Sequence, residues 1–247
     1  MRDDHGVRIL AFDTATPATS VALSLGDGRV LTRRHDPAPG ERPGHQTLLL
    51  AFAVELLEQA GLGFGELDRL AVGVGPGTFT GLRIGVATAR ALAQAHELDL
   101  VGISTLHALA AAADGERRPV VLPVIDARRG EAFAAAWRAA DARDPAAAPL
   151  LAPAALTPAA LVAAVGELPA APVGVGDGAL RFREQLEAAG VLVPASDSPS
   201  HRVDAAAHCR LAQTATPHAR DEVLPTYLRL PDAELALRRR AAGIERP

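Results

Sequence analysis

The sequence lacks most of the residues on which several kinds of active site depend. Cys209 is the only cysteine among the 247 residues, so the chain can form neither an internal disulfide nor a thiolate cage for a metal. It lies in an alanine-rich helical stretch, where we expect a buried structural thiol rather than a nucleophile. All 25 residues counted as Lys or Arg are arginine. The absence of lysine excludes a Schiff-base lysine, a Ser–Lys dyad and a P-loop lysine.

Histidine is present, but its spacing does not suit a metal site. None of the eight histidines has a second histidine four residues away, which excludes HExxH and HxxxH sites on one helix face. The sequence contains no G-x-S-x-G elbow, so nucleophilic hydrolysis is unsupported. The formal net charge of −4 argues against tight nucleic-acid binding by this chain alone, because phosphate contacts carry most of such affinity.

Membrane-directed segments are not evident either. The first ten residues are too acidic for a signal peptide. No apolar stretch reaches the roughly 18 residues that a membrane span needs without interruption. We therefore expect a cytoplasmic protein with no membrane contact.

The pattern of apolar runs and turns predicts an α/β protein with two lobes of related topology. Buried strands at residues 7–13 and 120–126 each end in aspartate, and each is followed by a turn and a second strand. We assign an N-terminal lobe to residues 1–115, a C-terminal lobe to 116–230 and a charged tail to 231–247. The Ala/Pro-rich stretch at 140–158 is predicted to be an exposed loop.

Two segments of the first lobe are candidates for binding phosphate. Asp13 and Thr14 follow the first strand, where a carboxylate and small hydroxyl residues could hold a hydrated cation or phosphate; the alternative is an ordinary turn into a hairpin. Gly75, Gly77 and Thr78 lie in GPGTFTGLR, a glycine-rich turn from a strand into a helix, whose backbone N–H groups favour an anion. Without lysine or GxGxxG spacing, this turn indicates neither P-loop nor dinucleotide chemistry.

The matching turn of the second lobe is Asp126-Ala127-Arg128-Arg129-Gly130. A phosphate-cradling turn needs small residues there, so that the backbone can approach the phosphate. Two arginines occupy the position instead. The paired clamp that a phosphotransferase requires is therefore not evident.

Helices predicted at residues 45–60 and 80–96 are unusual in their surfaces. At 100° per residue, the apolar residues of the first helix span roughly 240°, whereas a surface helix needs little more than about 100°. The second helix has small residues at intervals of four, a pattern that permits close helix packing. Either both helices lie between internal layers, or they present a partner surface. The residues proposed for that surface are Leu48, Leu49, Phe52, Leu56, Gly81, Gly85 and Ala89.

Several motifs resemble the TsaB family, the partner subunit of the bacterial tRNA threonylcarbamoyladenosine machinery. They run in order from the first strand to near the C-terminus: ILAFDTATPATSVAL, GHQTLLL, GPGTFTGLRIG, GISTLHAL, VIDARRGEAF and LPTYLR. The resemblance implies an actin-like, RNase H-like ATPase fold with two lobes. The family's catalytic relative, TsaD, binds metal through two histidines, and this chain has Thr105 and Leu109 at the corresponding positions.

The resemblance further implies a non-catalytic subunit that pairs with a TsaD-like catalytic subunit through the two helices of the first lobe. A TsaE-like ATPase would join the complex, and ATP and metal would be bound by the partners, with no cofactor on this chain. The tRNA would be held mainly by the assembly, with Arg33, Arg34, Arg128 and Arg129 as minor contacts. The alternatives are a free-standing kinase or metallopeptidase of the same fold, and a homodimer using the same helices.

Overall fold

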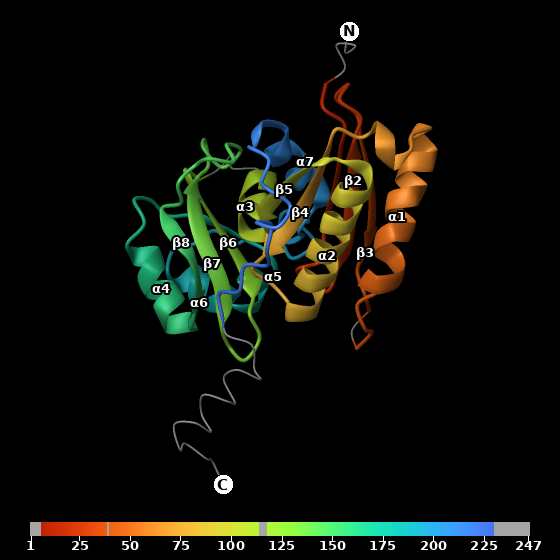
Figure 1. Cartoon of the computed structure of the whole chain (residues 1–247). Helices are drawn as coiled ribbons and strands as arrows, with labels where there is room; N and C mark the ends of the chain where they lie inside the picture. Colours follow the sequence, from red (N-terminus) through yellow and green to blue (C-terminus); the bar gives the residue numbers. More distant parts are fainter. Residues whose placement is uncertain (1–5, 39, 114–117, 230–247) are drawn as a thin grey trace, which may run out of the picture.

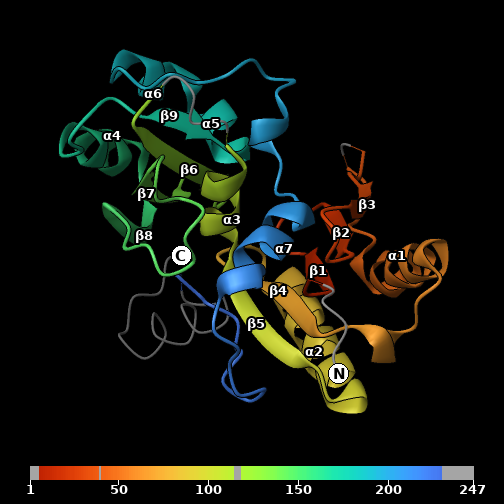
Figure 2. The same ribbon diagram turned by 90° about the horizontal axis from the view of Figure 1, so that it is seen from above.

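The structure, a computed structural model, describes residues 6–38, 40–113 and 118–229. Two mixed β-sheets stand side by side with helices between them and on both outer faces (Figures 1 and 2). The proposed lobe boundary at 115/116 and the proposed tail at 231–247 lie outside the described residues, so the division into domains stays a prediction.

The first sheet has five strands in the order β3-β2-β1-β4-β5. β1 pairs antiparallel with β2 and parallel with β4, so the chain makes a hairpin and then crosses over through α1. The bounds of α1 and α2 agree to within one residue with those predicted from the apolar patterns. The elements are β1 (Ile9–Asp13), β2 (Thr19–Ser24), β3 (Val30–His35), α1 (His45–Ala60), η1 (Phe64–Glu66), β4 (Arg69–Gly75), α2 (Phe79–His96) and β5 (Asp99–Ser104).

The second sheet repeats this pattern with four strands in the order β8-β7-β6-β9. β6 again pairs antiparallel with the next strand and parallel with a later one. This confirms the predicted duplication of a strand–Asp–turn–strand unit. The remaining elements are α3 (Thr105–Ala112), β6 (Val120–Asp126), β7 (Ala132–Arg138), β8 (Leu151–Leu156), α4 (Pro158–Gly166), β9 (Val173–Val175), α5 (Asp177–Arg181), α6 (Arg183–Ala188), η2 (Pro199–His201) and α7 (Ala205–Thr214).

Strand alternation explains why both sheets are covered on both faces. In β1, Leu10 and Phe12 pack against α1 and α2, whereas Ile9 and Ala11 pack against α7. Runs with apolar residues on both faces are typical of such sandwiched strands. In β6, Val121 faces α3 and the neighbouring residues face α4 and α6. The space between the sheets is therefore filled by α3 and α7 (Figure 2).

The prediction of an exposed loop at residues 140–158 was wrong. β8 forms within that stretch and pairs antiparallel with β7. Ala142 is buried, and its carbonyl lies 3.0 Å from His107 Nε2. Alanine and proline have low β propensity, but here an edge strand is stabilised by its neighbour and by α4.

Candidate functional site

The carboxylate of Asp13, the first candidate phosphate ligand, lies in the protein interior and contacts protein groups. One oxygen, Oδ1, accepts the backbone N–H of Ala15 at 2.7 Å. The other, Oδ2, accepts the Thr105 hydroxyl at 2.9 Å and lies 3.0 Å from Nε2 of His208 on α7. Burial acts to raise the pKa of the Asp13 carboxyl, but His208, Ala15 and Thr105 together outweigh it and hold that pKa below its usual value.

The chain segment before α7 closes the space between the sheets around this carboxylate. The backbone N–H of Ala205 donates to Ser20 Oγ at 3.0 Å. His201 is buried, and its Nδ1 lies 3.1 Å from the carbonyl oxygen of Gly176 in the second lobe. Residues 201–208 therefore bridge the two strand–turn units at the place where a ligand between the lobes would contact both.

The glycine-rich turn lies beside Asp13 and Thr14, so the structure brings the five candidate phosphate ligands together. However, the backbone N–H of Thr78 donates to the carbonyl of Ala15 at 2.7 Å. A methyl group on Gly77 would overlap that same carbonyl. The turn thus packs on the end of β1, and Asp13 and Thr14 are 1% and 0% exposed. These residues do not fit a nucleotide phosphate or its metal.

Two glycines of α2 also pack against the chain segment that follows β1. Thr14 Oγ1 donates to the carbonyl of Gly81 at 2.7 Å, and a methyl group on Gly81 would overlap the Thr14 carbonyl oxygen. Gly85 faces the Thr14 hydroxyl in the same way. These small residues therefore allow α2 to pack closely against its own sheet.

We expect Gly81→Ala to destabilise the protein by about 1–3 kcal/mol, because the added methyl forces α2 away from β1. An alanine in a helix interior normally stabilises by about 1 kcal/mol over glycine, so the sign of the change is informative. Gly166→Ala in α4 is the matched control, since nothing lies within 4 Å of the added methyl. Urea unfolding of both variants measures the difference. Equal effects of the two substitutions would contradict the packing described.

The turn of the second lobe has an unusual backbone. Arg128 and Arg129 have φ angles of 63° and 53°, a left-handed conformation that costs about 1–2 kcal/mol for a residue with a side chain. Asp126 Oδ2 lies 3.0 Å from Arg181 Nη1 and 3.4 Å from Arg128 Nη1. Burial raises the pKa of the neighbouring Asp177 carboxyl. Arginine side chains thus replace the small residues that a phosphate cradle needs.

Thr105 and Leu109, at the two positions where the resemblance implies metal-binding histidines in the catalytic relative, have structural roles here. The Thr105 hydroxyl donates a hydrogen bond to the Asp13 carboxylate, and Leu109 is fully buried in the core. The nearby His107 stacks on Trp137 with ring centroids 4.7 Å apart. Within the described residues, no group of three or more His, Cys, Asp or Glu side chains is arranged to hold a metal ion. Cys209 is buried as predicted, and burial raises the pKa of its thiol to about 12.

Most of the residues predicted to form the partner surface are buried in the chain's own interior. Leu49 and Leu56 of α1 are 2% and 0% exposed, and Gly81, Gly85 and Ala89 of α2 are buried against the sheet. The prediction was wrong for these five as exposed contacts, because Leu49, Leu56 and Ala89 pack in the core under the first sheet and Gly81 and Gly85 contact Thr14. Leu48 and Phe52 are only partly exposed.

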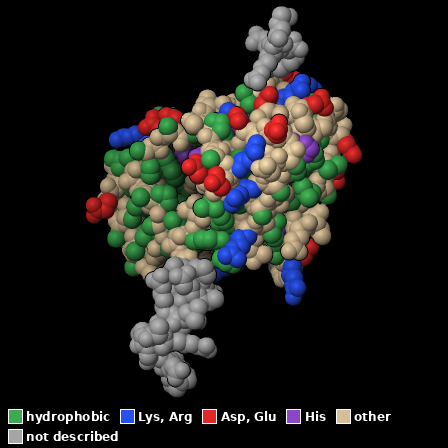
Figure 3. Space-filling model, viewed as in Figure 1, with side chains coloured by type: hydrophobic (Ala, Val, Ile, Leu, Met, Phe, Trp, Pro, Cys, Tyr) green, Lys and Arg blue, Asp and Glu red, His purple; other side chains and the backbone are tan. Residues whose placement is uncertain are grey.

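The apolar surface of the helix pair is instead formed by residues that sequence reasoning missed. Leu50 and Val54 of α1 are 47% and 40% exposed. Helix geometry places them within about 40° of each other around the helix axis. Ala87 and Ala91 of α2 are also exposed. α1 and α2 lie side by side (Figure 1), and Figure 3 shows apolar side chains over this pair of helices. We call Leu50, Val54, Ala87 and Ala91 the helix-pair surface.

Among the described helices, none is both long enough and apolar enough to cross a bilayer.

Comparisons with known proteins find two kinds of tRNA threonylcarbamoyladenosine protein, TsaD and TsaB. The family model for TsaD, tRNA N6-adenosine threonylcarbamoyltransferase, matches residues 41–162. The Escherichia coli tRNA threonylcarbamoyladenosine biosynthesis protein TsaB is 42% identical over 135 residues, which are 53% of this chain and 55% of that protein. The Haemophilus influenzae protein of the same name is 40% identical over 130 residues, or 53% of its length. The alignments thus span about half the length of these curated relatives.

Solved structures extend the similarity over most of the chain. YeaZ from Pseudomonas aeruginosa has a TM-score of 0.73 and 29% sequence identity, covering 90% of this chain and 100% of that one. A second structure from the same bacterium, described as a protein with similarity to peptidase YeaZ, has a TM-score of 0.74. Together with the two sheets of repeated topology, this confirms the predicted actin-like, RNase H-like fold.

Proposed function

We propose that this chain, which is 40–42% identical to two TsaB proteins over about half of its length, belongs to the TsaB family. We infer that it is a scaffolding and activating subunit of the enzyme complex that makes threonylcarbamoyladenosine in tRNA. The complex transfers a threonylcarbamoyl group to the N6 amine of the adenosine beside the anticodon, and a TsaD-like subunit supplies the chemistry. This chain supplies a docking surface and no catalytic residue. The proposal places it in the cytoplasm with its tRNA substrate.

One observation supports the non-catalytic role above the others: the Asp13 carboxylate has no free oxygen for a ligand. Both oxygens contact protein donors, and α7 covers them. The kinase alternative needs that carboxylate and a paired phosphate cradle, whereas the second turn has Arg128 and Arg129. The metallopeptidase alternative needs metal ligands where this chain has Thr105 and Leu109. We therefore propose that ATP and metal are bound by partner subunits, TsaD-like and TsaE-like, and not by this chain.

The helix-pair surface is the proposed contact with the TsaD-like subunit. Exposed aliphatic side chains beside small ones allow a partner helix to approach closely, as in antiparallel helix packing. The isolated chain would cover the same surface by forming a homodimer, which the TsaD-like subunit then displaces.

Mixing the purified chain with a TsaD-like subunit tests the pairing. Size-exclusion chromatography with light scattering should show one species that contains both chains, in place of the separate peaks. Separate elution at micromolar concentrations would overturn the proposed pairing. Equilibrium dialysis of the isolated chain with ATP and Mg²⁺ tests the catalytic alternatives, and stoichiometric ATP binding would favour the kinase.

A further inference from the structure

A second exposed surface adjoins the helix-pair surface on α2, along the edge where the segment from His218 to Tyr227 follows the helix. Ala91 of the helix-pair surface borders the same hollow as Arg90 and Gln94. Phe79 and Tyr227 are 38% and 39% exposed, and their ring centroids are 5.2 Å apart. The Arg83 guanidinium carbon lies 3.7 Å from the centre of the Phe79 ring. Arg83 Nε also donates to the Tyr227 hydroxyl at 3.2 Å. Two segments far apart in the sequence thus contribute two adjacent rings at the surface, and one guanidinium that lies over the first ring and donates to the hydroxyl of the second.

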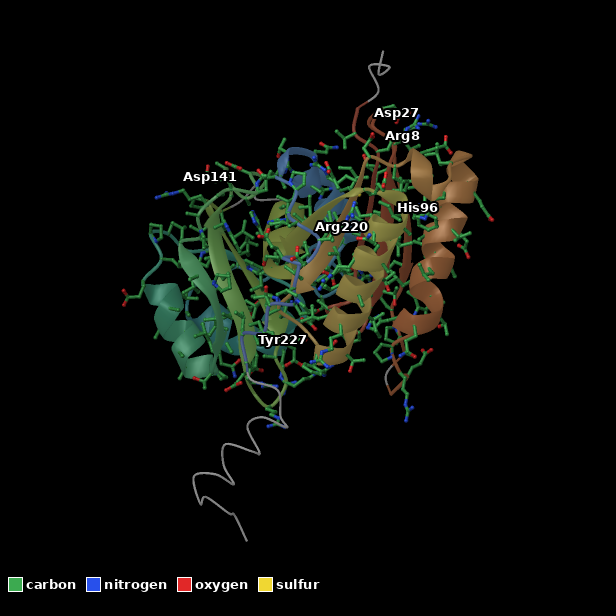
Figure 4. The ribbon with its side chains drawn as sticks, viewed as in Figure 1. Arg8, Asp27, His96, Asp141, Arg220 and Tyr227 are labelled. Carbon is green, nitrogen blue, oxygen red and sulfur yellow. The ribbon has the colours of Figure 1, made fainter. Side chains whose placement is uncertain are left out.

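Arg90 continues this cluster along α2, and Arg220 continues it on the neighbouring segment. Helix geometry places Phe79, Arg83, Arg90 and Gln94 within about 60° around the axis of α2, and Arg83 and Gln94 about 16 Å apart along it. Arg220 Nη1 donates to Gln94 Oε1 at 3.2 Å. Figure 4 labels Arg220 and Tyr227 at the two ends of the segment, and Figure 3 shows blue side chains spaced down this part of the face. We call Phe79, Arg83, Arg90, Arg220 and Tyr227 the arginine–aromatic strip.

The guanidinium groups of Arg83 and Arg220 contact neutral side chains rather than carboxylates. A ring and a phenol position Arg83, and an amide positions Arg220. In the part of the chain that the structure describes, no carboxylate lies within ion-pair distance of Arg83, Arg90 or Arg220. Arg90 and Arg220 border an open hollow of about 730 Å³. Asp99 and Asp221 border it too, but Asp99 lies 3.7 Å from Arg69.

From this arrangement we propose that the arginine–aromatic strip binds unpaired nucleotides of an RNA strand. Guanidinium groups in a row suit backbone phosphates. Exposed aromatic rings stack on bases that are not engaged in a helix, which is how proteins commonly recognise single-stranded RNA. The inference rests on the proposed function, in which the RNA is the tRNA substrate. With a net charge of −4, the chain binds this RNA as one part of the complex rather than tightly by itself.

The experiment uses the complex of this chain with a TsaD-like subunit and a transcript of a tRNA that reads ANN codons. Fluorescence anisotropy gives the Kd at several salt concentrations. The double variant Arg83→Gln and Arg90→Gln should raise Kd at least tenfold. It should also reduce the slope of log K against log salt by about 1.4, since each phosphate contact with a single strand contributes about 0.7. Tyr227→Ala should raise Kd about tenfold through lost stacking, whereas Tyr227→Phe keeps the ring and should change Kd less than threefold.

Arg143→Gln is the matched control, because Arg143 is exposed in the second lobe and should leave Kd and salt slope unchanged. An unchanged Kd and slope in the double variant would overturn the RNA proposal while leaving the proposed pairing intact. Loss of the complex in that variant would also overturn it, because the strip would then contact the partner protein. If the wild-type chains do not pair, the proposed function fails, and the RNA proposal fails with it because it requires the assembled complex.

Discussion

Replacing both Leu50 and Val54 with aspartate should weaken binding to a TsaD-like subunit by at least a hundredfold. Both side chains are exposed on α1, so the free chain tolerates the change. Fully burying one such side chain contributes roughly 1.5–3 kcal/mol, and two carboxylates at a helix–helix contact would add the cost of removing them from water. Surface plasmon resonance with the TsaD-like subunit immobilised measures the Kd directly.

Val30→Asp is the matched control for this prediction. Val30 is 39% exposed and is the first residue of the edge strand β3. The substitution therefore places a carboxylate at a similarly exposed aliphatic position outside the two helices. With one added carboxylate against two in the double variant, it should leave Kd within about twofold of the wild type. Equal losses in the control and the double variant, or tight binding by the double variant, would show that the partner uses another surface.

His208→Ala should destabilise the protein by roughly 3–5 kcal/mol, because it removes the basic partner of a fully buried carboxylate. Asp13 and His208 are 1% and 0% exposed, so water cannot replace the lost contact without opening the interior. A double-mutant cycle with Asp13→Asn separates this contact from the cavity left by the ring. Urea unfolding of the four proteins should give a coupling free energy of 1 kcal/mol or more. Coupling near zero would contradict a stabilising pair.

The pH dependence of stability provides a second test of the same site. Since folding lowers the pKa of the Asp13 carboxyl, its contribution to stability is present above its usual pKa of 3.8 and is lost as pH falls through the folded value. The wild type should therefore lose more stability below pH 4 than Asp13→Asn. Parallel profiles for the two proteins would contradict the lowered pKa.

Much of the fold could be predicted from local patterns, because strands and helices were bounded by glycine, proline and polar turns. α1 has its predicted bounds of His45–Ala60. Ser104 and Thr157 cap their helices as expected. The repeated strand–Asp unit predicted two lobes of related topology, and the two sheets do repeat the same pairing pattern. β8 was missed because alanine and proline gave no strand signal in the residues themselves.

The candidate site was less predictable, since its contacts join distant parts of the chain. Nothing near Asp13 in the sequence indicates that His208 lies beside it. The wide apolar arc of α1 contains side chains that face the sheet and others that remain exposed, and only the position of the sheet shows which are which. Leu50 and Val54 belonged to that arc. The small residues of α2 suited either an internal or a partner contact, and the nearest atoms of Thr14 show that Gly81 and Gly85 make the internal one.

Reconstituted tRNA modification tests the central proposal most directly. A TsaD-like subunit, its ATPase partner, threonylcarbamoyl adenylate and an ANN-reading tRNA are incubated with and without this chain, and the modified nucleoside is measured by mass spectrometry. The proposal predicts modification that depends on this chain and none when this chain is the only protein present. Modification by this chain alone, or undiminished modification in its absence, would contradict a non-catalytic activating subunit.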